Sequence, residues 1–148
     1  MALNLDIEKF KEIMENKISK DCARFVERIS PLTIFMTSIE NITNAVWHTM
    51  IPGEDESFDE SDWIFIIHID SCVSILIEME VYPDDFNIWF DLNHMDEPII
   101  DNVKCYIVGD NLVCDEKLDI SDNERLKATM DPEVLEALQK VLNTIEVR

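Results

Sequence analysis

The glycines and histidines that build many catalytic and cofactor-binding motifs are few and widely spaced in this chain. The two glycines, Gly53 and Gly109, cannot supply a GxSxG nucleophile elbow, a phosphate-binding loop or a dinucleotide-binding fingerprint. The three histidines, His48, His68 and His94, show neither an HExxH motif nor another paired metal-binding spacing. We therefore predict that the protein is not an enzyme and that it needs no metal or other cofactor.

The four cysteines form no CxxC pair. Cys22, Cys72, Cys105 and Cys114 all fall within apolar patterns, which is typical of buried reduced thiols in a cytosolic protein. A hairpin around Gly109-Asp110 would place Cys105 opposite Cys114 in a non-hydrogen-bonded pair, where the Cβ atoms come close. We therefore predict a potential cross-strand disulfide in oxidising buffer, with two reduced neighbouring thiols as the alternative.

A metal-dependent nuclease is the one enzyme class with loose support. Two acids would hold a divalent cation and a nearby lysine would stabilise charge on phosphate, and Pro83-Asp84 with Asp115-Glu116-Lys117 provide those residue types. However, 12 Lys and Arg against 32 Asp and Glu give a formal charge of -20, which would repel a nucleic-acid substrate. The charge disfavours a nuclease and any direct binding of nucleic acid or an anionic membrane.

The acids are concentrated in one part of the chain. No Lys or Arg lies between Ile29 and Val103, yet half of the acids do. Because this segment has no cations of its own, its repulsion costs stability and a basic protein is its natural complement. The predicted partner-binding residues are acids of this segment and one tryptophan: Glu54, Asp55, Glu56, Asp59, Glu60, Asp62, Glu78, Glu80, Asp84, Asp85, Trp89, Asp91, Asp96 and Glu97.

Acids that meet Lys and Arg would give fast, salt-sensitive association with a basic partner. One version is an inhibitor, immunity-type protein or chaperone that covers a basic protein. The other is a DNA mimic, such as a phage anti-defence protein, whose carboxylates imitate phosphates toward a nucleic-acid-binding enzyme. The sequence does not choose between them, and an ordinary solvated acidic surface is the alternative to both.

The predicted core is a set of three alternating runs, Trp63 to Asp70, Val73 to Tyr82 and Phe86 to Leu92. The first run is largely apolar on both faces, as in a central strand, whereas the second and third are expected to be antiparallel strands with one solvent-exposed face. The connectors Asp70-Ser71 and Pro83 to Asp85 suit tight hairpins. Apolar side chains on that solvent-exposed face, among them Leu76 and Trp89, would anchor a partner or lie under a helix of the same chain.

Helices are expected before the strands. Apolar spacings of three and four predict a long amphipathic helix from Leu5 to Ile29. Ser30-Pro31 would start a second helix that continues to Met50, with a pair of strands as the alternative because many residues there are β-branched. Glu54 to Asp62 would form an acidic loop, which lacks the glycine of an EF-hand calcium site.

The last third is expected to form a second hairpin and two more helices. The order is a polar link, two strands, a helix opened by a capping box and a final amphipathic helix: Asn93 to Asn102, Val103 to Val108, Asn111 to Ile120, Ser121 to Met130, and Asp131 to the C-terminus. Together the patterns predict one α+β domain over residues 1–148, with an antiparallel sheet of about five strands packed against N- and C-terminal amphipathic helices. No signal-peptide pattern or membrane-spanning run is present, so a cytoplasmic location is expected.

The run NVKCYIVGDNLVCDEKLDI, followed by DPEVLEALQKVLNTI, resembles the closing half of the type III secretion chaperone-like fold. This fold also occurs in small acidic bacterial proteins, and the resemblance covers about the last third of the chain. It implies a non-enzymatic and often dimeric binder of a segment of another protein. A homodimer is therefore a further expectation.

Overall fold

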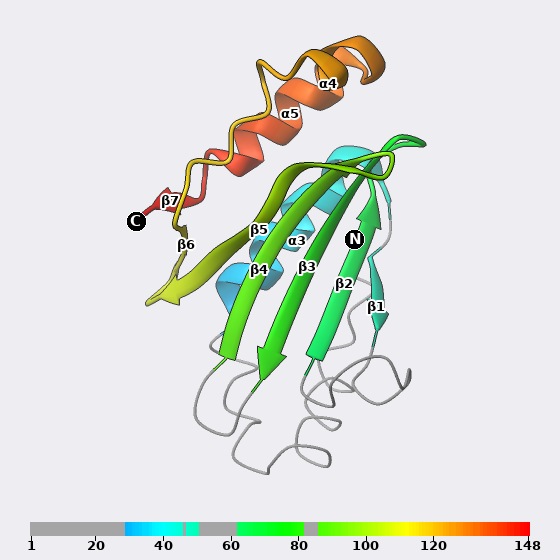
Figure 1. Cartoon of the computed structure of the whole chain (residues 1–148). Coiled ribbons are helices and arrows are strands. Elements are labelled where there is room, and N and C mark those ends of the chain that lie inside the picture. The colour runs from blue at the N-terminus through cyan, green and yellow to red at the C-terminus, as the bar shows by residue number, and fades with distance from the viewer. Residues whose placement is uncertain (1–28, 46, 51–61, 82–85) are drawn as a thin grey trace.

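In the computed structural model, residues 29–45, 47–50, 62–81 and 86–148 are described (Figure 1). They form one seven-stranded sheet in which the strands follow each other in chain order from β1 to β7. The elements are α3 Ser30–Thr43, β1 His48–Met50, β2 Asp62–His68, β3 Val73–Val81, β4 Phe86–His94, β5 Glu97–Val108, β6 Asn111–Cys114, α4 Glu124–Thr129, α5 Pro132–Leu142 and β7 Glu146–Val147. The predicted α+β class is confirmed, and the sheet is antiparallel except where β6 pairs with β7 in parallel.

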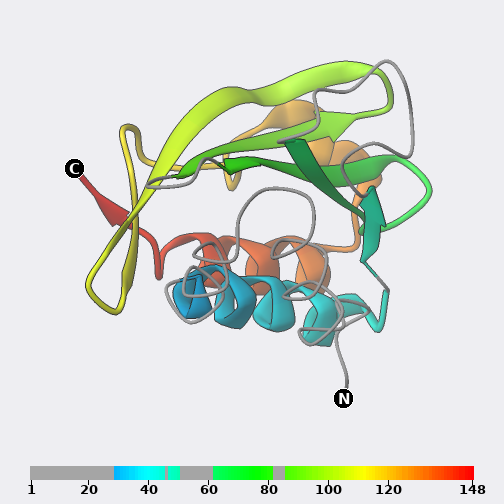
Figure 2. The ribbon, with the colours of Figure 1, turned by 90° about the horizontal axis from the view of Figure 1, so that it is seen from below.

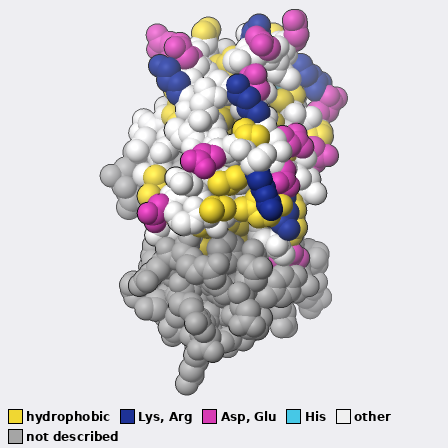
Figure 3. Space-filling view, turned by 90° about the vertical axis from the view of Figure 1, so that its left-hand side faces the viewer, with side chains coloured by type: hydrophobic (Ala, Val, Ile, Leu, Met, Phe, Trp, Pro, Cys, Tyr) yellow, Lys and Arg dark blue, Asp and Glu magenta, His cyan; other side chains and the backbone are white. Residues whose placement is uncertain are grey.

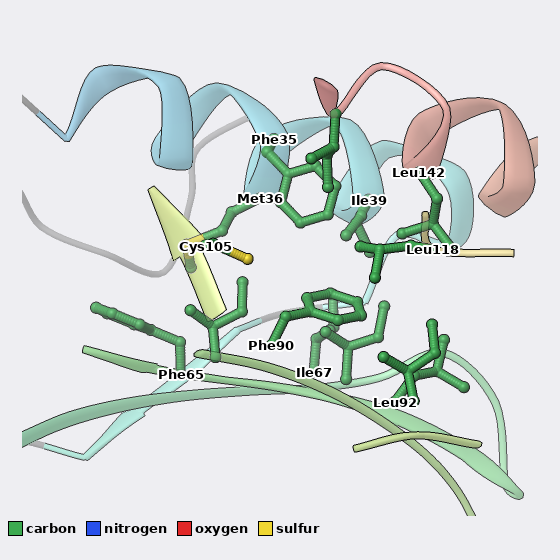
Figure 4. Close-up of a cluster of buried hydrophobic side chains, with 14 of the residues drawn as sticks. Phe35, Met36, Ile39, Phe65, Ile67, Phe90, Leu92, Cys105, Leu118 and Leu142 are labelled. Carbon is green, nitrogen blue, oxygen red and sulfur yellow. The ribbon is translucent and has the colours of Figure 1, made fainter. Parts of the chain in front are cut away.

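The core lies between the sheet and two helices. Figure 2 shows α3 and α5 side by side on one face of the sheet. In Figure 4 the side chains of α3 and α5 point toward alternate residues of the strands. The labelled core residues are Phe35, Met36, Ile39, Phe65, Ile67, Phe90, Leu92, Cys105, Leu118 and Leu142, and all of them are buried. This packing removes the apolar stripe of each helix from water, which is the main favourable term in folding.

The three central strands agree with the alternation in the sequence. β2, β3 and β4 match the predicted runs to within two residues at every end that the structure describes, and they pair antiparallel. Trp63, Ile75 and Phe90 face the helices and are buried, whereas their neighbours along each strand face the other way. The prediction of one solvent-exposed face is therefore confirmed for β3 and β4, whereas on β2 Ile64, which faces away from the helices, is buried as well.

The prediction of a helix that continues to Met50 is wrong. α3 ends at Thr43, and Asn44 follows it in the left-handed region with φ 57°. Asparagine tolerates this conformation, and its backbone N–H donates to the carbonyl of Glu40, so it closes the last turn. The chain then crosses to the sheet, where Trp47 Nε1 donates to the Met36 carbonyl at 3.0 Å and His48–Met50 form β1.

The predicted polar link from Asn93 to Asn102 is also wrong, because β4 continues to His94 and β5 begins at Glu97. A two-residue turn joins these strands, and Met95 takes up a positive φ of 57° within it. Asn102 also has a positive φ, of 52°, where the register between β4 and β5 shifts. This bulge breaks the two-residue alternation, so the first half of β5 does not look like a strand in the sequence.

Three boundaries in the last third also differ from the prediction. β6 ends at Cys114 instead of Ile120, and α5 ends at Leu142, after which Glu146–Val147 pair with β6. The predicted helix before Met130 is present as α4, but its N-cap is Asn123, whose side chain accepts from two backbone N–H groups, and not Ser121. The sheet therefore has more strands than expected, and one parallel pair.

Several predictions lie outside the described residues. These are the first helix with Cys22, apart from Ile29 at its end, the acidic loop up to residue 61, and the hairpin connector from Pro83 to Asp85.

Glu40 is a buried carboxylate within the apolar face of α3. It is 1% exposed, and its Oε2 atom has no hydrogen-bond partner in the described part of the chain. Burying an unsatisfied polar group costs about 1–3 kcal/mol. We therefore expect Glu40→Leu to raise the free energy of unfolding by about 1–2 kcal/mol in urea denaturation. Glu40→Gln, which keeps a polar side chain, should raise the free energy of unfolding by less. A lower free energy of unfolding in Glu40→Leu would show that the carboxylate has hydrogen-bond partners.

Candidate functional site

The face of the sheet opposite α3 and α5 carries Glu78, Glu80 and Asp91, three of the described acids of the cation-free segment. We call it the outer face and define it by the residues of β3, β4 and β5 that alternate with the core: Leu76, Glu78, Glu80, Asn87, Trp89, Asp91, Lys104 and Tyr106. Each of these residues is partly exposed. In Figure 1 α3 lies behind the sheet, so the outer face is turned toward the viewer.

Strand pairing brings four of the predicted binding residues together. Glu78 is the direct cross-strand partner of Trp89, and Asp91 is the partner of Leu76. Glu80 pairs with Asn87 one step along the same face. Directly opposed residues in a sheet have neighbouring side chains, so the Trp89 side chain lies next to that of Glu78, with Glu80 and Asp91 further along the same face.

Two of these carboxylates are held by hydrogen bonds. Asn87 Nδ2 donates to Glu80 Oε1 at 3.4 Å, and the backbone N–H of Asn102 donates to Asp91 Oδ1 at 2.7 Å. Partial burial raises the pKa of Asp91, the Asn102 N–H opposes this rise, and the neighbouring charge of Asp101 adds to it. The β5 bulge at Asn102 therefore orients the Asp91 carboxylate.

A small cationic cluster lies beside the acids. Lys104 pairs with Trp89, and its Nζ lies 6.0 Å from the Trp89 ring centre and 5.4 Å from that of Tyr106. Arg148 Cζ lies 4.6 Å from the Tyr106 ring centre, and the Tyr106 hydroxyl donates to Asp115 Oδ2 at 3.0 Å. The sequence reasoning missed this cluster, because Lys104 follows the cation-free segment in the chain and reaches Trp89 only through the pairing of β4 with β5.

The predicted residues Asp96 and Glu97 lie elsewhere, at the turn between β4 and β5. Glu97 forms an ion pair with Arg125 of α4, and this contact lowers the pKa of Glu97. Next to it, buried His94 uses Nε2 to bond Thr129 Oγ1 at 3.1 Å, and Thr129 in turn donates to the Arg125 carbonyl. Glu97 therefore attaches α4 to the sheet instead of joining the outer face.

The remaining predicted residues are only partly visible. Asp62 lies in β2 opposite Glu80. The others fall outside the described residues: Glu54, Asp55, Glu56, Asp59, Glu60, Asp84 and Asp85.

The residues considered for metal or nuclease chemistry do not converge in the described part of the chain. His48 and His68 lie on adjacent strands with ring centres 6.5 Å apart. Within the described ranges, no three His, Cys, Asp or Glu side chains are placed to hold a metal ion. Asp115 and Lys117 lie in the exposed segment after β6, and the predicted partner Asp84 is not described.

A groove of about 420 Å³ lies along α4 and α5. Its apolar lining comes from Met130, Pro132 and Leu135, and Lys127 and Lys140 also line it. Both lysines have acidic partners, at 3.7 Å from Asp122 and 3.6 Å from Glu136. Figure 3, which views the molecule from the side of β6 and β7, shows Lys and Arg side chains among acids and next to hydrophobic side chains.

No family model, curated protein or solved structure matches this chain. The resemblance of the last third to the type III secretion chaperone-like fold stays a prediction. None of the described helices is both long and apolar enough to span a membrane.

Proposed function

We propose that this protein binds a basic protein partner through the outer face and inhibits or chaperones it, without catalysing a reaction. The observation that carries the proposal is the position of Trp89, which is partly exposed, opposite Glu78 and on the same face as Glu80 and Asp91. Tryptophan is the residue type that most often anchors a protein interface. Carboxylates around such an anchor select Lys and Arg on the partner.

The contact between Lys104 and Trp89 supports a cationic partner group at this position. A Lys or Arg over the face of an indole ring is attracted by the ring quadrupole, and here the Lys104 ammonium already lies 6.0 Å from the ring centre. A guanidinium of the partner would meet the same ring with the Glu78 carboxylate opposite it on β3 and Asp91 two residues further along β4. The formal charge of -20 would also speed the encounter at low ionic strength.

The double variant Glu80→Gln/Asp91→Asn tests the charge of the outer face with little change in its structure. Both amides keep an oxygen that accepts the existing bond, from Asn87 Nδ2 or from the Asn102 N–H. We expect the variant to weaken partner binding about tenfold, and Trp89→Ala to weaken it about 30-fold. The measurement is capture from a lysate of the cells that express this chain, at low and high salt, followed by titration of the captured partner.

The matched control is Glu124→Gln/Glu133→Gln, which removes the same charge from α4 and α5. The proposal expects a basic protein that the wild type and the control capture and that high salt releases. If the wild type captures no basic protein at low salt, the proposal fails. If the control weakens binding as much as Glu80→Gln/Asp91→Asn, only the total charge matters and the outer face is not the site.

A further inference from the structure

Two buried thiols face each other between β5 and β6. Cys105 is the cross-strand partner of Cys114, as the sequence predicts, and the two Sγ atoms are 3.0 Å apart. Cys105 is 4% exposed and Cys114 is fully buried, and both sulfurs are free thiols. The pair lies on the core side of the sheet, whereas Lys104 and Tyr106, on either side of Cys105, belong to the outer face.

The backbone geometry favours a bond between the sulfurs. The Asp115 N–H donates to the Lys104 carbonyl at 3.2 Å, so the next pair along the ladder, Cys105 with Cys114, is a non-hydrogen-bonded pair. In such a pair the Cα atoms approach to about 4.5 Å, at the short end of the range that disulfides span. A disulfide has sulfurs about 2.05 Å apart, so the two side chains need to shift by only about 1 Å.

We propose that Cys105 and Cys114 form a redox modification site, at which hydrogen peroxide converts the two thiols into one disulfide that joins β5 to β6. The sulfur of Cys114, as thiolate, attacks one peroxide oxygen and the O–O bond breaks. This gives a sulfenic acid on Cys114 and a hydroxide, which takes up the thiol proton and becomes water. The sulfur of Cys105 then attacks Cys114 Sγ, and the sulfenic oxygen leaves with the Cys105 proton as a second water.

The roles of the two sulfurs follow from their shared hydrogen bond. This bond lowers the pKa of Cys114 and raises the pKa of Cys105, so Cys114 is the sulfur that ionises first. Burial opposes the ionisation of Cys114, as do the nearby charges of Asp115 and Glu116. The reaction therefore requires local opening, and the pair lies next to a short edge, where β7 has two residues and the Arg148 N–H donates to the Cys114 carbonyl.

Mass spectrometry of the wild-type protein tests the proposal directly. Cleavage after Lys104 and Lys117 gives one peptide that contains both cysteines. After peroxide treatment and alkylation under denaturing conditions, we expect this peptide without alkyl groups and lighter by two hydrogens. Two alkyl groups on this peptide would overturn the proposal, and so would a bond from Cys105 or Cys114 to Cys72, or a sulfinic acid as the main product.

Thermal unfolding gives a second readout. A disulfide that closes a loop of about ten residues should raise the melting temperature by on the order of 5–10 °C, and a reducing agent should reverse the rise. The matched control Cys72→Ser, at a partly exposed cysteine, should show the same rise, whereas Cys114→Ser should show none. An equal rise in Cys114→Ser would mean that another group is responsible and would overturn the proposal.

Discussion

Replacing Phe90 with alanine should lower the free energy of unfolding by about 3–5 kcal/mol. Phe90 is 1% exposed, in the middle of β4, and its ring meets the Phe35 ring of α3 edge to face with ring centres 6.0 Å apart. Alanine removes most of this buried surface, so the transfer free energy of the ring is lost. The cavity left between the sheet and the helix destabilises the fold further. Urea denaturation at constant pH measures the change.

The control for Phe90 is a neighbour of Phe35 on the other side of α3. Ile34 is 66% exposed, so Ile34→Ala should change stability by no more than about 0.5 kcal/mol. A double-mutant cycle of Phe35→Leu with Phe90→Leu should show a coupling of about 0.5–1.5 kcal/mol, as expected for an aromatic pair. A loss below about 1 kcal/mol in Phe90→Ala would mean that the helix does not cover the sheet at this point.

Phe90 also shows which part of the fold is readable from the sequence. The face of β4 on which the Phe90 side chain lies follows from strict alternation with Trp89 and Asp91. Alternation is a local property that needs no knowledge of the partner strand. The same alternation correctly places β2 and β3. The pairing of Cys105 with Cys114 is also predicted correctly, because a two-residue turn at Gly109, with φ 61°, fixes the register of that hairpin.

The elements that the sequence does not reveal depend on contacts far away in the chain. β7 exists because Glu146–Val147 reach Cys114, more than thirty residues earlier, and two residues carry no periodic signal. α3 ends at Thr43 with Asn44 instead of a glycine as its C-cap, and the Trp47 bond to Met36 directs the chain toward the sheet. The first half of β5 is concealed by the bulge at Asn102, whose N–H holds Asp91.

In the candidate site, too, some features follow from local alternation and others depend on the pairing of distant strands. That Glu78, Glu80 and Asp91 lie on the polar side of their strands follows from alternation. That Trp89 lies opposite Glu78 depends on the register of β3 with β4, and the presence of Lys104 beside it depends on the register of β4 with β5. The outer face is therefore less uniformly acidic than a count along the chain suggests, and its acids are concentrated toward β3.

Gln139 illustrates a structural role that no sequence pattern indicates. Its Oε1 accepts from the N–H groups of Ile120 and Ser121, at 2.7 and 3.0 Å. Its Nε2 donates to the Leu118 carbonyl at 3.1 Å and to Asn143 Oδ1 at 2.9 Å. One side chain of α5 thus satisfies three backbone groups of the irregular segment between β6 and α4, where Leu118 and Ile120 are buried.

Gln139→Ala should therefore lower the free energy of unfolding by about 2–4 kcal/mol, because backbone groups beside buried Leu118 and Ile120 lose their partners. Gln139→Leu, which keeps the volume, should lose a similar amount if the hydrogen bonds are the cause, whereas near-wild-type stability would show that Gln139 acts by packing alone. Asn143→Ala removes a single exposed bond and should cost at most about 1 kcal/mol. Hydrogen exchange of the Ile120 and Ser121 amides locates the effect, since both should lose protection in Gln139→Ala and keep it in Asn143→Ala.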